Sequence, residues 1–371
     1  MYYLNIIFFL YLYYLMKHTL LIIGAGQLGL LLLEESTKLS KYIEKIYIYT
    51  DTEDNCCRYL NYDFIEIIIG SYNDKDKLNK ISNMCDYITY EFENFPVDVF
   101  SQNNKHKIFP NIDILKIVQD KYTQKQFMLS NNINVPTFNI INSYQDIVNF
   151  INIHKYPVFL KNRKGSFDGR GNQLIKDDND LNKFTDIKPN IYIIEKYIDF
   201  DKEVSIIGCK NSNNDIIYYD IVQNKHKNSI LIETIFPDNN LSKTIKDKII
   251  NIFNKILELF NTRGIICVEF FIKDDLIYYN ECCLRVHNSG HHTLKSSYTS
   301  QFENHFRSVM DLQLGPHINV FSGHFYNIIS ELHTEEIINQ KCDLKKNTHY
   351  IKYYNKKPVG IRKIGHLIIK N

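Results

Sequence analysis

The sequence predicts α/β and α+β architecture, with an N-terminal doubly wound parallel sheet and a small C-terminal domain. Three observations predict this fold class. From residue 17 to about 110, apolar strands alternate with helical segments, as in a parallel sheet. The section that follows is rich in antiparallel strand patterns, and a tail from about Gly315 carries only short strands. We therefore expect three domains, at 17–112, 113–315 and 316–371.

Each element of the first domain follows from its local pattern. The apolar run 20–23 predicts a strand, and a helix begins after the glycines that follow it. Two more runs of β-branched and aromatic residues, 45–50 and 64–70, predict strands. A polar helix over 72–84 then leads into a fourth strand at 86–91. The order strand, helix, strand, strand, helix, strand predicts a small parallel sheet.

The second domain begins with a helix expected over 111–132 and a strand-helix-strand unit that ends at residue 162. Further on, apolar alternation predicts strands, and spacing of three and four residues predicts one long amphipathic helix. The strands are expected over 191–198, 202–210, 216–224 and 229–237, the helix over 241–261, and a closing hairpin over 264–283.

Composition excludes several kinds of partner. The chain has 371 residues, of which 44% are hydrophobic and 23% charged, which is typical of a globular protein with a sizeable core. It has 44 basic and 42 acidic residues, so no broad basic field indicates binding to nucleic acid or to an anionic membrane. The eight cysteines include no Cys-x-x-Cys pair and no zinc spacing. Small-molecule partners and reduced thiols in the cytoplasm are expected.

The first sixteen residues, "MYYLNIIFFLYLYYLM", are apolar and uncharged. They are shorter than the roughly 20 residues that span a bilayer, and they lack a basic region and a cleavage site. We expect that 1–16 is a non-native or mis-started extension and that Met16 is the true start. A genuine hydrophobic extension is the alternative.

The first strand-helix turn lies in "LLIIGAGQLGLLLLEES" and carries Gly24, Gly26 and Gly29. This spacing, with Asp51 after the second strand, is the dinucleotide-binding pattern, and it makes an NAD-dependent oxidoreductase one hypothesis. Any doubly wound domain that brings a phosphate or a backbone segment close to a helix N-terminus needs similar glycines. An ordinary tight turn is therefore an equal alternative on this motif alone.

Two features of the middle section indicate a nucleotide site. Lys161 ends a strand directly before "NRKGSFDGRG", a loop whose amides and Arg170 could cover a triphosphate, although a plain surface loop would look similar. Glu195 and Glu203 follow as a possible edge for adenine and ribose, with solvated carboxylates as the alternative.

Two further features indicate a metal and a polar substrate. Glu269 and Glu281 lie on the two strands of one apolar hairpin, where carboxylates are costly unless they are paired or bound to metal. With Asn280 they offer oxygen ligands suited to Mg²⁺ that bridges nucleotide phosphates. "RVHNSGHHT" then places one arginine and three histidines within nine residues, directly after the second strand.

Taken together, the motifs resemble those of the N5-carboxyaminoimidazole ribonucleotide synthetase family, which are ATP-grasp enzymes of purine biosynthesis. The resemblance runs in order from Lys17 to the end of the chain. It rests on "GAGQLG", "YEFENFP", "DKYTQKQF", "GSFDGRG", "EKYIDFDKEVSIIG", "NKHKNSIL", "YYNECCLRVHNSGHHT", "TSQFENHFRSV" and "RKIGHL".

The resemblance implies an ATP-dependent ligase that carboxylates 5-aminoimidazole ribonucleotide with bicarbonate through carboxyphosphate, with ATP and Mg²⁺ as cofactors. It implies a homodimer in the cytoplasm, with no nucleic acid and no membrane as partner. Because carboxyphosphate is rapidly lost in water, a loop at 164–171 is expected to close over it. The 17–112 domain would bind the ribonucleotide, and 113–315 would form the ATP-grasp domain.

The resemblance also implies roles for individual residues. Catalytic roles fall on Lys161, Arg170 and Arg285, and metal binding on Glu269 and Glu281. ATP would be bound by Lys121, Lys161, Ser166, Phe167, Asp168, Gly169, Arg170, Gly171, Glu195, Lys196, Tyr197, Ile198, Glu203, His226, Asn280 and Glu281. The ribonucleotide would be bound by Gln27, Leu28, Glu91, Asp168, Asn288, Lys356, Arg362 and Lys363.

The chain departs from the family pattern at several of these positions. The family usually has arginine where Lys121 stands, and lysine lacks the bidentate fork of arginine. It usually has Gly-Gly-Tyr at Gly165-Ser166-Phe167, glycine at Ser229 and Ala-Pro at Cys283-Leu284. Three alternatives stay open: a related ligase such as the formate-using glycinamide ribonucleotide transformylase, a nucleotide-binding protein without turnover, and the oxidoreductase.

Overall fold

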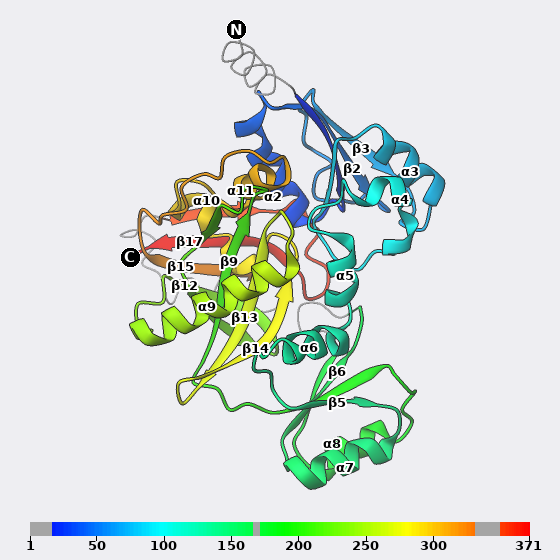
Figure 1. The fold of residues 1–371 in the computed structure, drawn as a ribbon, viewed down its shortest axis with the longest axis vertical. Coiled ribbons are helices and arrows are strands. Elements are labelled where there is room, and N and C mark those ends of the chain that lie inside the picture. Colours follow the sequence, from blue (N-terminus) through cyan, green and yellow to red (C-terminus); the bar gives the residue numbers. More distant parts are fainter. Residues whose placement is uncertain (1–16, 166–170, 331–348) are drawn as a thin grey trace.

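The computed structural model describes residues 17–165, 171–330 and 349–371, and they form three β-sheets with helices between and around them (Figure 1). The expected extension at 1–16 lies outside the described residues, as do Ser166 to Arg170 of the loop. No helix in the described part of the chain is both long and apolar enough to cross a membrane.

In the described residues the first sheet has four parallel strands, as the sequence predicted, and their order is β3-β2-β1-β4. Its glycine turn leads directly from β1 into a helix. The strands are β1 (His18–Ile23), β2 (Ile43–Thr50), β3 (Ile65–Ile69) and β4 (Tyr87–Tyr90). The helical segments of this region are α2 (Gln27–Ser36), η1 (Thr37–Leu39), α3 (Lys75–Asn83), η2 (Val97–Val99) and α4 (Gln102–Lys105).

The second sheet is a small antiparallel lobe in the order β5-β8-β6-β7, at the lower end of the molecule in Figure 1. It has its own apolar cluster, in which Phe150 of a covering helix packs with Leu160 and Ile194 of the sheet. The elements are β5 (Phe138–Ile141), α7 (Tyr144–His154), β6 (Val158–Asn162), β7 (Asn172–Ile175), α8 (Asp178–Leu181), η3 (Asn182–Phe184) and β8 (Tyr192–Lys196).

The third sheet has nine strands, with the path β14-β13-β9-β11-β12-β15-β17-β16 and β10 beside β9. The strands after residue 315 continue this sheet, and the division at 315 stays a prediction. The strands are β9 (Lys202–Lys210), β10 (Ile216–Tyr218), β11 (Val222–Lys227), β12 (Ile230–Phe236), β13 (Ile266–Lys273), β14 (Leu276–Cys283), β15 (Gly323–Ile329), β16 (His349–Tyr353) and β17 (Lys363–Lys370). The helical segments are α9 (Lys243–Phe260), η4 (Asn288–Gly290), α10 (Thr293–Ser296) and α11 (Gln301–Val309).

Two elements differ from the sequence prediction. The helix expected over 111–132 is two helices, α5 (Ile112–Val118) and α6 (Lys121–Ser130). Asp120 separates them because its carboxylate caps α6, accepting hydrogen bonds from the amides of Tyr122 and Thr123. The strand expected over 216–224 is also divided, into β10 and β11. The first break places Lys121 at the start of a helix, where it faces the site described below.

The hairpin β13–β14 turns at Asp274 and Asp275, which both have left-handed backbone angles (φ 48° and 63°). Two such residues in sequence match the twist of an antiparallel pair, and from this turn the register runs as far as Phe270 opposite Tyr279. A β-bulge next to Glu269 then shifts the register by one residue, so that Glu269 lies directly opposite Glu281. The turn and the bulge together place the two predicted metal ligands on one face of the sheet.

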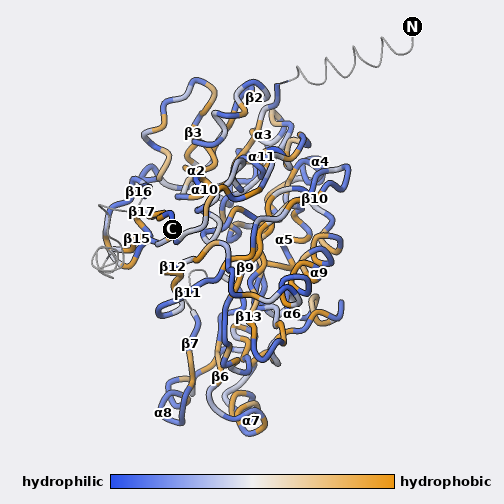
Figure 2. Tube along the Cα trace, turned by 90° about the vertical axis from the view of Figure 1, so that its left-hand side faces the viewer, coloured by the Kyte–Doolittle hydropathy of each residue, from blue (hydrophilic) through white to orange (hydrophobic). Residues whose placement is uncertain are grey.

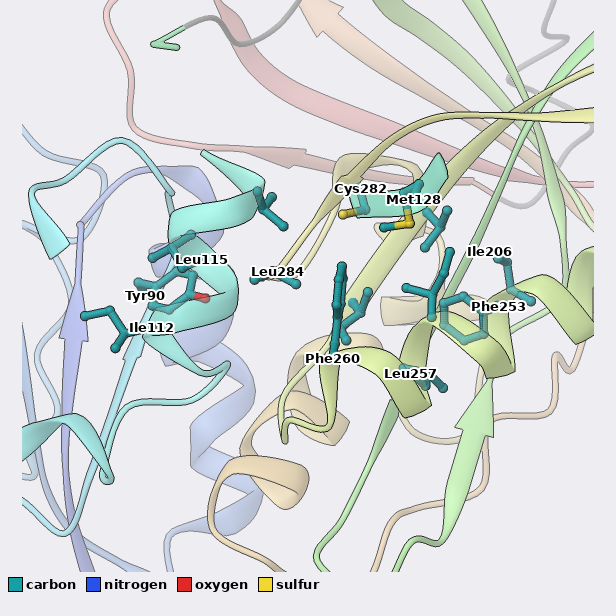
Figure 3. Packing of buried hydrophobic residues seen from close by; sticks show 14 of the residues in the cluster. Tyr90, Ile112, Leu115, Met128, Ile206, Phe253, Leu257, Phe260, Cys282 and Leu284 are labelled. Atoms are coloured by element: carbon teal, nitrogen blue, oxygen red, sulfur yellow. The ribbon is translucent and has the colours of Figure 1, made fainter. Parts of the chain in front are cut away.

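A continuous apolar core joins the first sheet to the third. Figure 3 shows Tyr90 and Leu115 close to Leu284, with Phe260 and Met128 beyond them. The 18-residue helix α9 contributes an apolar stripe that includes Ile249, and Figure 2 shows its mixed hydrophobic and hydrophilic residues. Burying side chains of this size contributes about 1.5–3 kcal/mol each. All seven cysteines in the described part of the chain are free thiols, as expected.

Candidate active site

A cavity of about 500 Å³ lies where the N-terminus of α2, the end of β4, the start of α6, the β13–β14 hairpin and the 356–363 segment meet. It brings together eleven of the residues predicted for catalysis, ATP, metal or ribonucleotide. These are Gln27, Leu28, Glu91, Lys121, His226, Glu269, Glu281, Arg285, Asn288, Lys356 and Lys363.

Arg362 lies apart from this group. It lines an adjoining cavity of about 470 Å³, together with Asp51 and Arg58. The two cavities share Glu91 and Lys356 among their walls, so the residues predicted for the ribonucleotide span both.

The loop expected to cover the phosphates is described only at its ends. Ser166, Phe167, Asp168, Gly169 and Arg170 lie outside the described residues, so their predicted roles stay predictions. Gly171 has a left-handed backbone (φ 82°), and a Cβ there would come within 2.5 Å of the Asn162 amide nitrogen. This position therefore favours glycine, because its left-handed conformation strains other residues and a Cβ would require the Asn162 side chain to move.

Three buried side chains form an ionic cluster beside the cavity. Glu195, on β8, accepts a hydrogen bond from the Lys161 ammonium at 2.8 Å and lies 3.2 Å from the Lys125 ammonium. Lys125 also donates to the Asn280 carbonyl at 2.9 Å. Burial opposes ionisation of Glu195, but the two lysines outweigh it and lower its pKa. Lys125 thus connects the small lobe to the hairpin that carries the predicted metal ligands.

Sequence reasoning did not select Lys125, although it lies in the quoted motif "DKYTQKQF". Its side chain is only 2% exposed, and burial lowers its pKa to about 8. The spacing of Lys121 and Lys125 gave a usable indication, because residues four apart share one face of a helix.

Lys121 forms an ion pair with Glu281 at the floor of the cavity. The ammonium holds the pKa of Glu281 at about 2, although burial acts in the opposite direction. Within the described residues Glu269 has no such ion pair at hydrogen-bond distance, and Nε2 of the His287 ring lies 3.7 Å from its carboxylate. Burial and the carboxylates of Glu203 and Glu281 raise the pKa of Glu269 to about 8.

This arrangement fits Mg²⁺. Two carboxylates face each other across the hairpin, and repulsion between them is relieved when a cation binds. No group of three or more histidine, cysteine or carboxylate side chains in the described residues is placed to hold a metal alone. Magnesium sites in phosphoryl-transfer enzymes are commonly built from one or two carboxylates together with substrate phosphates and water. Glu269 and Glu281 would supply the protein's share.

The other residues predicted for ATP lie around this floor. Glu203 lies 2.8 Å from the His226 ring, and its charge raises the pKa of His226 against the effect of burial. The Asn280 amide nitrogen lies 3.5 Å from Glu203. Lys196 is exposed at the end of β8, and Tyr197 and Ile198 beyond it are half-buried. The end of β8 is thus available to a ligand, while Glu195 points inward.

The first amides of α2, at the glycine turn, form a position that favours an anionic group. In the structure Glu91 occupies this position. Its carboxylate accepts hydrogen bonds from the amides of Gly26 at 3.0 Å and Gly29 at 3.3 Å. Helix N-termini favour an anion, and here the protein itself provides one. The turn therefore positions Glu91, and Glu91 with Gln27 and Leu28 faces the cavity.

Arg285 is placed by a second carboxylate of the "YEFEN" segment. Glu93 accepts a hydrogen bond from the Leu284 amide at 2.6 Å and lies 3.6 Å from the Arg285 guanidinium. A proline at position 284, as in the family pattern, would have no amide proton to donate. Sequence reasoning missed Glu93, although the quoted motif contained it.

Asn288 has a buried side chain that lines the cavity. Within the described residues, neither its amide oxygen nor its amide nitrogen has a hydrogen-bond partner. A buried amide without partners costs free energy unless a ligand or water satisfies it. This observation indicates a polar ligand in the cavity next to Asn288.

Comparison with known families agrees with this architecture. The sequence matches the ribonucleotide synthetase preATP-grasp domain over residues 16–119 and the ATP-grasp domain over residues 126–302. The chain is therefore an ATP-grasp enzyme, an ATP-dependent ligase, with a preATP-grasp domain in front.

Individual relatives define the family more closely. The chain is 34% identical to N5-carboxyaminoimidazole ribonucleotide synthase of Staphylococcus aureus over 294 residues, 78% of this chain and 76% of that protein. It is 28% identical to the Staphylococcus epidermidis enzyme of the same name, over 95% and 92% of the two chains. The crystal structure of the S. aureus synthetase complexed with ADP superposes with a TM-score of 0.85, at 30% identity, over 96% and 94%. The chain belongs to the N5-carboxyaminoimidazole ribonucleotide synthase family.

Proposed function

We propose that this chain converts 5-aminoimidazole ribonucleotide, bicarbonate and ATP into N5-carboxyaminoimidazole ribonucleotide, ADP and phosphate. One observation carries the proposal besides family membership. A single cavity is lined both by the Lys121, Glu269 and Glu281 group suited to a nucleotide phosphate and by the polar side chains of Asn288 and Lys356. Such an arrangement brings a phosphoryl donor and a second polar substrate together.

ATP would bind with its base at the end of β8, along Lys196, Tyr197 and Ile198. Its ribose would meet Glu203, and its phosphates would meet Lys161 and Lys121. For the phosphates to be bound, Lys161 must exchange Glu195 for a phosphate oxygen. The loop from Ser166 to Gly171 and the pair His226 and Asn280 complete the proposed ATP site.

Mg²⁺ bound by Glu269 and Glu281 would neutralise charge on the β- and γ-phosphates. The residues of this chain would hold the reacting groups in line. A bicarbonate oxygen attacks the γ-phosphorus, the bond to the β-phosphate oxygen breaks, and ADP leaves. The guanidinium of Arg285, held by Glu93, would orient the bicarbonate and stabilise the carboxyphosphate that forms.

The ribonucleotide would supply the second nucleophile. Its exocyclic amine attacks the carboxyl carbon of carboxyphosphate, the carbon–oxygen bond to phosphate breaks, and the amine loses a proton. The ribonucleotide would contact Glu91, Gln27, Leu28 and Asn288, and its phosphate would lie near three basic side chains. Those are Lys356, Arg362 and Lys363. A homodimer in the cytoplasm remains a proposal that rests on the family resemblance.

Phosphate release from ATP tests this proposal. We expect release to require bicarbonate and to rise strongly when 5-aminoimidazole ribonucleotide is added. Stimulation by glycinamide ribonucleotide and formate would instead support the transformylase alternative. Binding of ATP without turnover would support a protein that has lost its activity, and specific binding of NADH would support an oxidoreductase.

A further inference from the structure

Tyr354, His291 and His366 form a buried hydrogen-bonded chain outside the cavity. The Tyr354 hydroxyl lies 3.0 Å from Nδ1 of His291 and 2.6 Å from Nδ1 of His366. None of the three residues is more than 2% exposed. The two histidines come from "NSGH" and "RKIGH", motifs whose histidines have no place in the proposed chemistry.

Both imidazoles are neutral in this environment. Burial lowers the pKa of His291 far below its usual range and that of His366 to about 3. A neutral ring has one nitrogen that donates and one that accepts. The Tyr354 hydroxyl therefore donates to Nδ1 of one histidine and accepts from the Nδ1–H of the other, so it hydrogen-bonds to both rings. No other side chain in the described residues hydrogen-bonds to both histidines.

Each member of this chain is a short distance along the backbone from a cavity residue. His291 donates its amide proton to the carbonyl of Asn288 at 3.2 Å. Lys356 follows Tyr354 by two residues, and Lys363 precedes His366 by three. The hydroxyl thus joins the three segments that carry Asn288, Lys356 and Lys363.

The hydroxyl adds a connection that the backbone does not supply. The Tyr354 amide donates to the Ile364 carbonyl at 2.9 Å, which already ties the end of β16 to β17. The link from this pair of strands to the Asn288 segment runs through the side chains, with the hydroxyl at its centre. Loss of the hydroxyl alone would leave the strands paired and remove the hydrogen bonds that tie the Asn288 segment to them.

We propose that Tyr354 is a positioning residue for the ribonucleotide: its hydroxyl, held between His291 and His366, sets Asn288 in register with Lys356 and Lys363. This inference rests on the proposed function, since it assumes that these three residues contact 5-aminoimidazole ribonucleotide. It assigns to the two motif histidines a role that involves no contact with substrate.

The test compares Tyr354→Phe with Tyr219→Phe. Tyr219 is a matched control, because it is 1% exposed and its hydroxyl also makes two hydrogen bonds, to Thr299 and Asn304. We expect Tyr354→Phe to raise both KM and the calorimetric Kd for 5-aminoimidazole ribonucleotide by fivefold or more. KM for ATP should stay within twofold of wild type, and Tyr219→Phe should leave all three constants within twofold.

A second pair of variants covers the case in which Tyr354→Phe does not fold. In His291→Asn the side-chain amide can stand in for Nδ1, whereas His291→Leu cannot bond to the hydroxyl. We expect the asparagine variant to keep a KM for the ribonucleotide near that of wild type and the leucine variant to raise it. Equal values in these two variants, or in the two tyrosine variants, would overturn the role of Tyr354. A wild type that neither binds nor uses the ribonucleotide would overturn the proposed function itself.

Discussion

At the scale of single residues, the site depends on how buried charges are balanced. Glu195 is shared by Lys125 and Lys161, and Lys161 must leave it to bind a phosphate. Lys125 then remains as the buried partner of Glu195. Without Lys125, moving Lys161 from Glu195 to a phosphate would leave this buried carboxylate with no cation, which is strongly disfavoured.

We therefore expect Lys125→Met to raise KM for ATP by tenfold or more, with a much smaller change in KM for the ribonucleotide. Steady-state kinetics with each substrate varied in turn measures both. Lys210→Met is the matched control, because Lys210 is also buried but hydrogen-bonds to Asn261 and Asn214. If both variants change KM for ATP alike, the effect reflects general destabilisation and Lys125 has no special part.

The carboxylates of the hairpin give a second residue-scale prediction. Changing Glu269 or Glu281 to glutamine should lower kcat by a hundredfold or more, about 2.7 kcal/mol of transition-state stabilisation, since the amide binds Mg²⁺ poorly. Circular dichroism should show an unchanged fold. Glu233→Gln is the control, because Glu233 pairs with Lys225 and His324 outside the cavity. Near-normal turnover of both hairpin variants would remove them from the mechanism.

At the scale of elements, the junction of β1 and α2 holds Glu91 in place. A Cβ on Gly26 would meet the Glu91 carboxylate oxygens at 2.8 and 3.0 Å, so any side chain there displaces this carboxylate. Gly26→Val should raise KM for the ribonucleotide and leave the affinity for ATP nearly unchanged. Glu91→Gln, which keeps the volume but removes the charge, should act in the same direction. Loss of ATP binding with the ribonucleotide retained, or binding of NAD at the turn of the wild type, would contradict this account.

The same junction shows how far sequence reasoning reaches. The glycine spacing predicted a strand, a tight turn and a helix, and all three are present. The anion at the helix terminus was not predictable from local pattern, because Glu91 is 65 residues away and reaches Gly26 only through the pairing of β1 with β4. Likewise, the break between α5 and α6 arises because Asp120 caps α6, and its guanidinium partner Arg163 lies on the small lobe. Hydrophobic periodicity and residue propensity predict which helices and strands form. Contacts between distant segments determine where these helices and strands end.

At the scale of the whole molecule, buried neutral histidines make stability depend on pH. Burial lowers the pKa of His305 to about 3, and its ring bonds to Thr89 and accepts from the Ile265 amide. In the unfolded chain a histidine titrates near 6.5. Below that pH the unfolded state binds a proton that the native state does not, so this histidine makes stability fall as pH decreases from about 6.5 toward 3.

His305→Gln removes this titration. The variant should be less stable than wild type at pH 7.5, because two buried hydrogen bonds are disturbed. The difference in the free energy of unfolding between the two proteins should narrow as pH falls from 7 to 4.5, by up to about 1.4 kcal/mol per pH unit. The difference in Tm should narrow with it. Differential scanning calorimetry at several pH values measures the difference. A constant difference would show that His305 takes up a proton in the native state.

For the whole molecule, too, the sequence predicted some features and only the structure showed others. Motif order predicted the family and eleven residues that line one cavity. Lys125, Glu93 and Tyr354 were missed because their partners are side chains and backbone groups from distant segments, which the local sequence does not indicate.

The proposed reaction phosphorylates bicarbonate before the carboxyl group is transferred, and transfer of an oxygen isotope shows whether it does. The enzyme is incubated with ATP, 5-aminoimidazole ribonucleotide and ¹⁸O-labelled bicarbonate, and the released phosphate is analysed by mass spectrometry. Carboxyphosphate keeps one bicarbonate oxygen on phosphorus when the carbon–oxygen bond breaks, so we expect one ¹⁸O in each phosphate. Phosphate free of ¹⁸O, formed together with carboxylated ribonucleotide, would contradict the account.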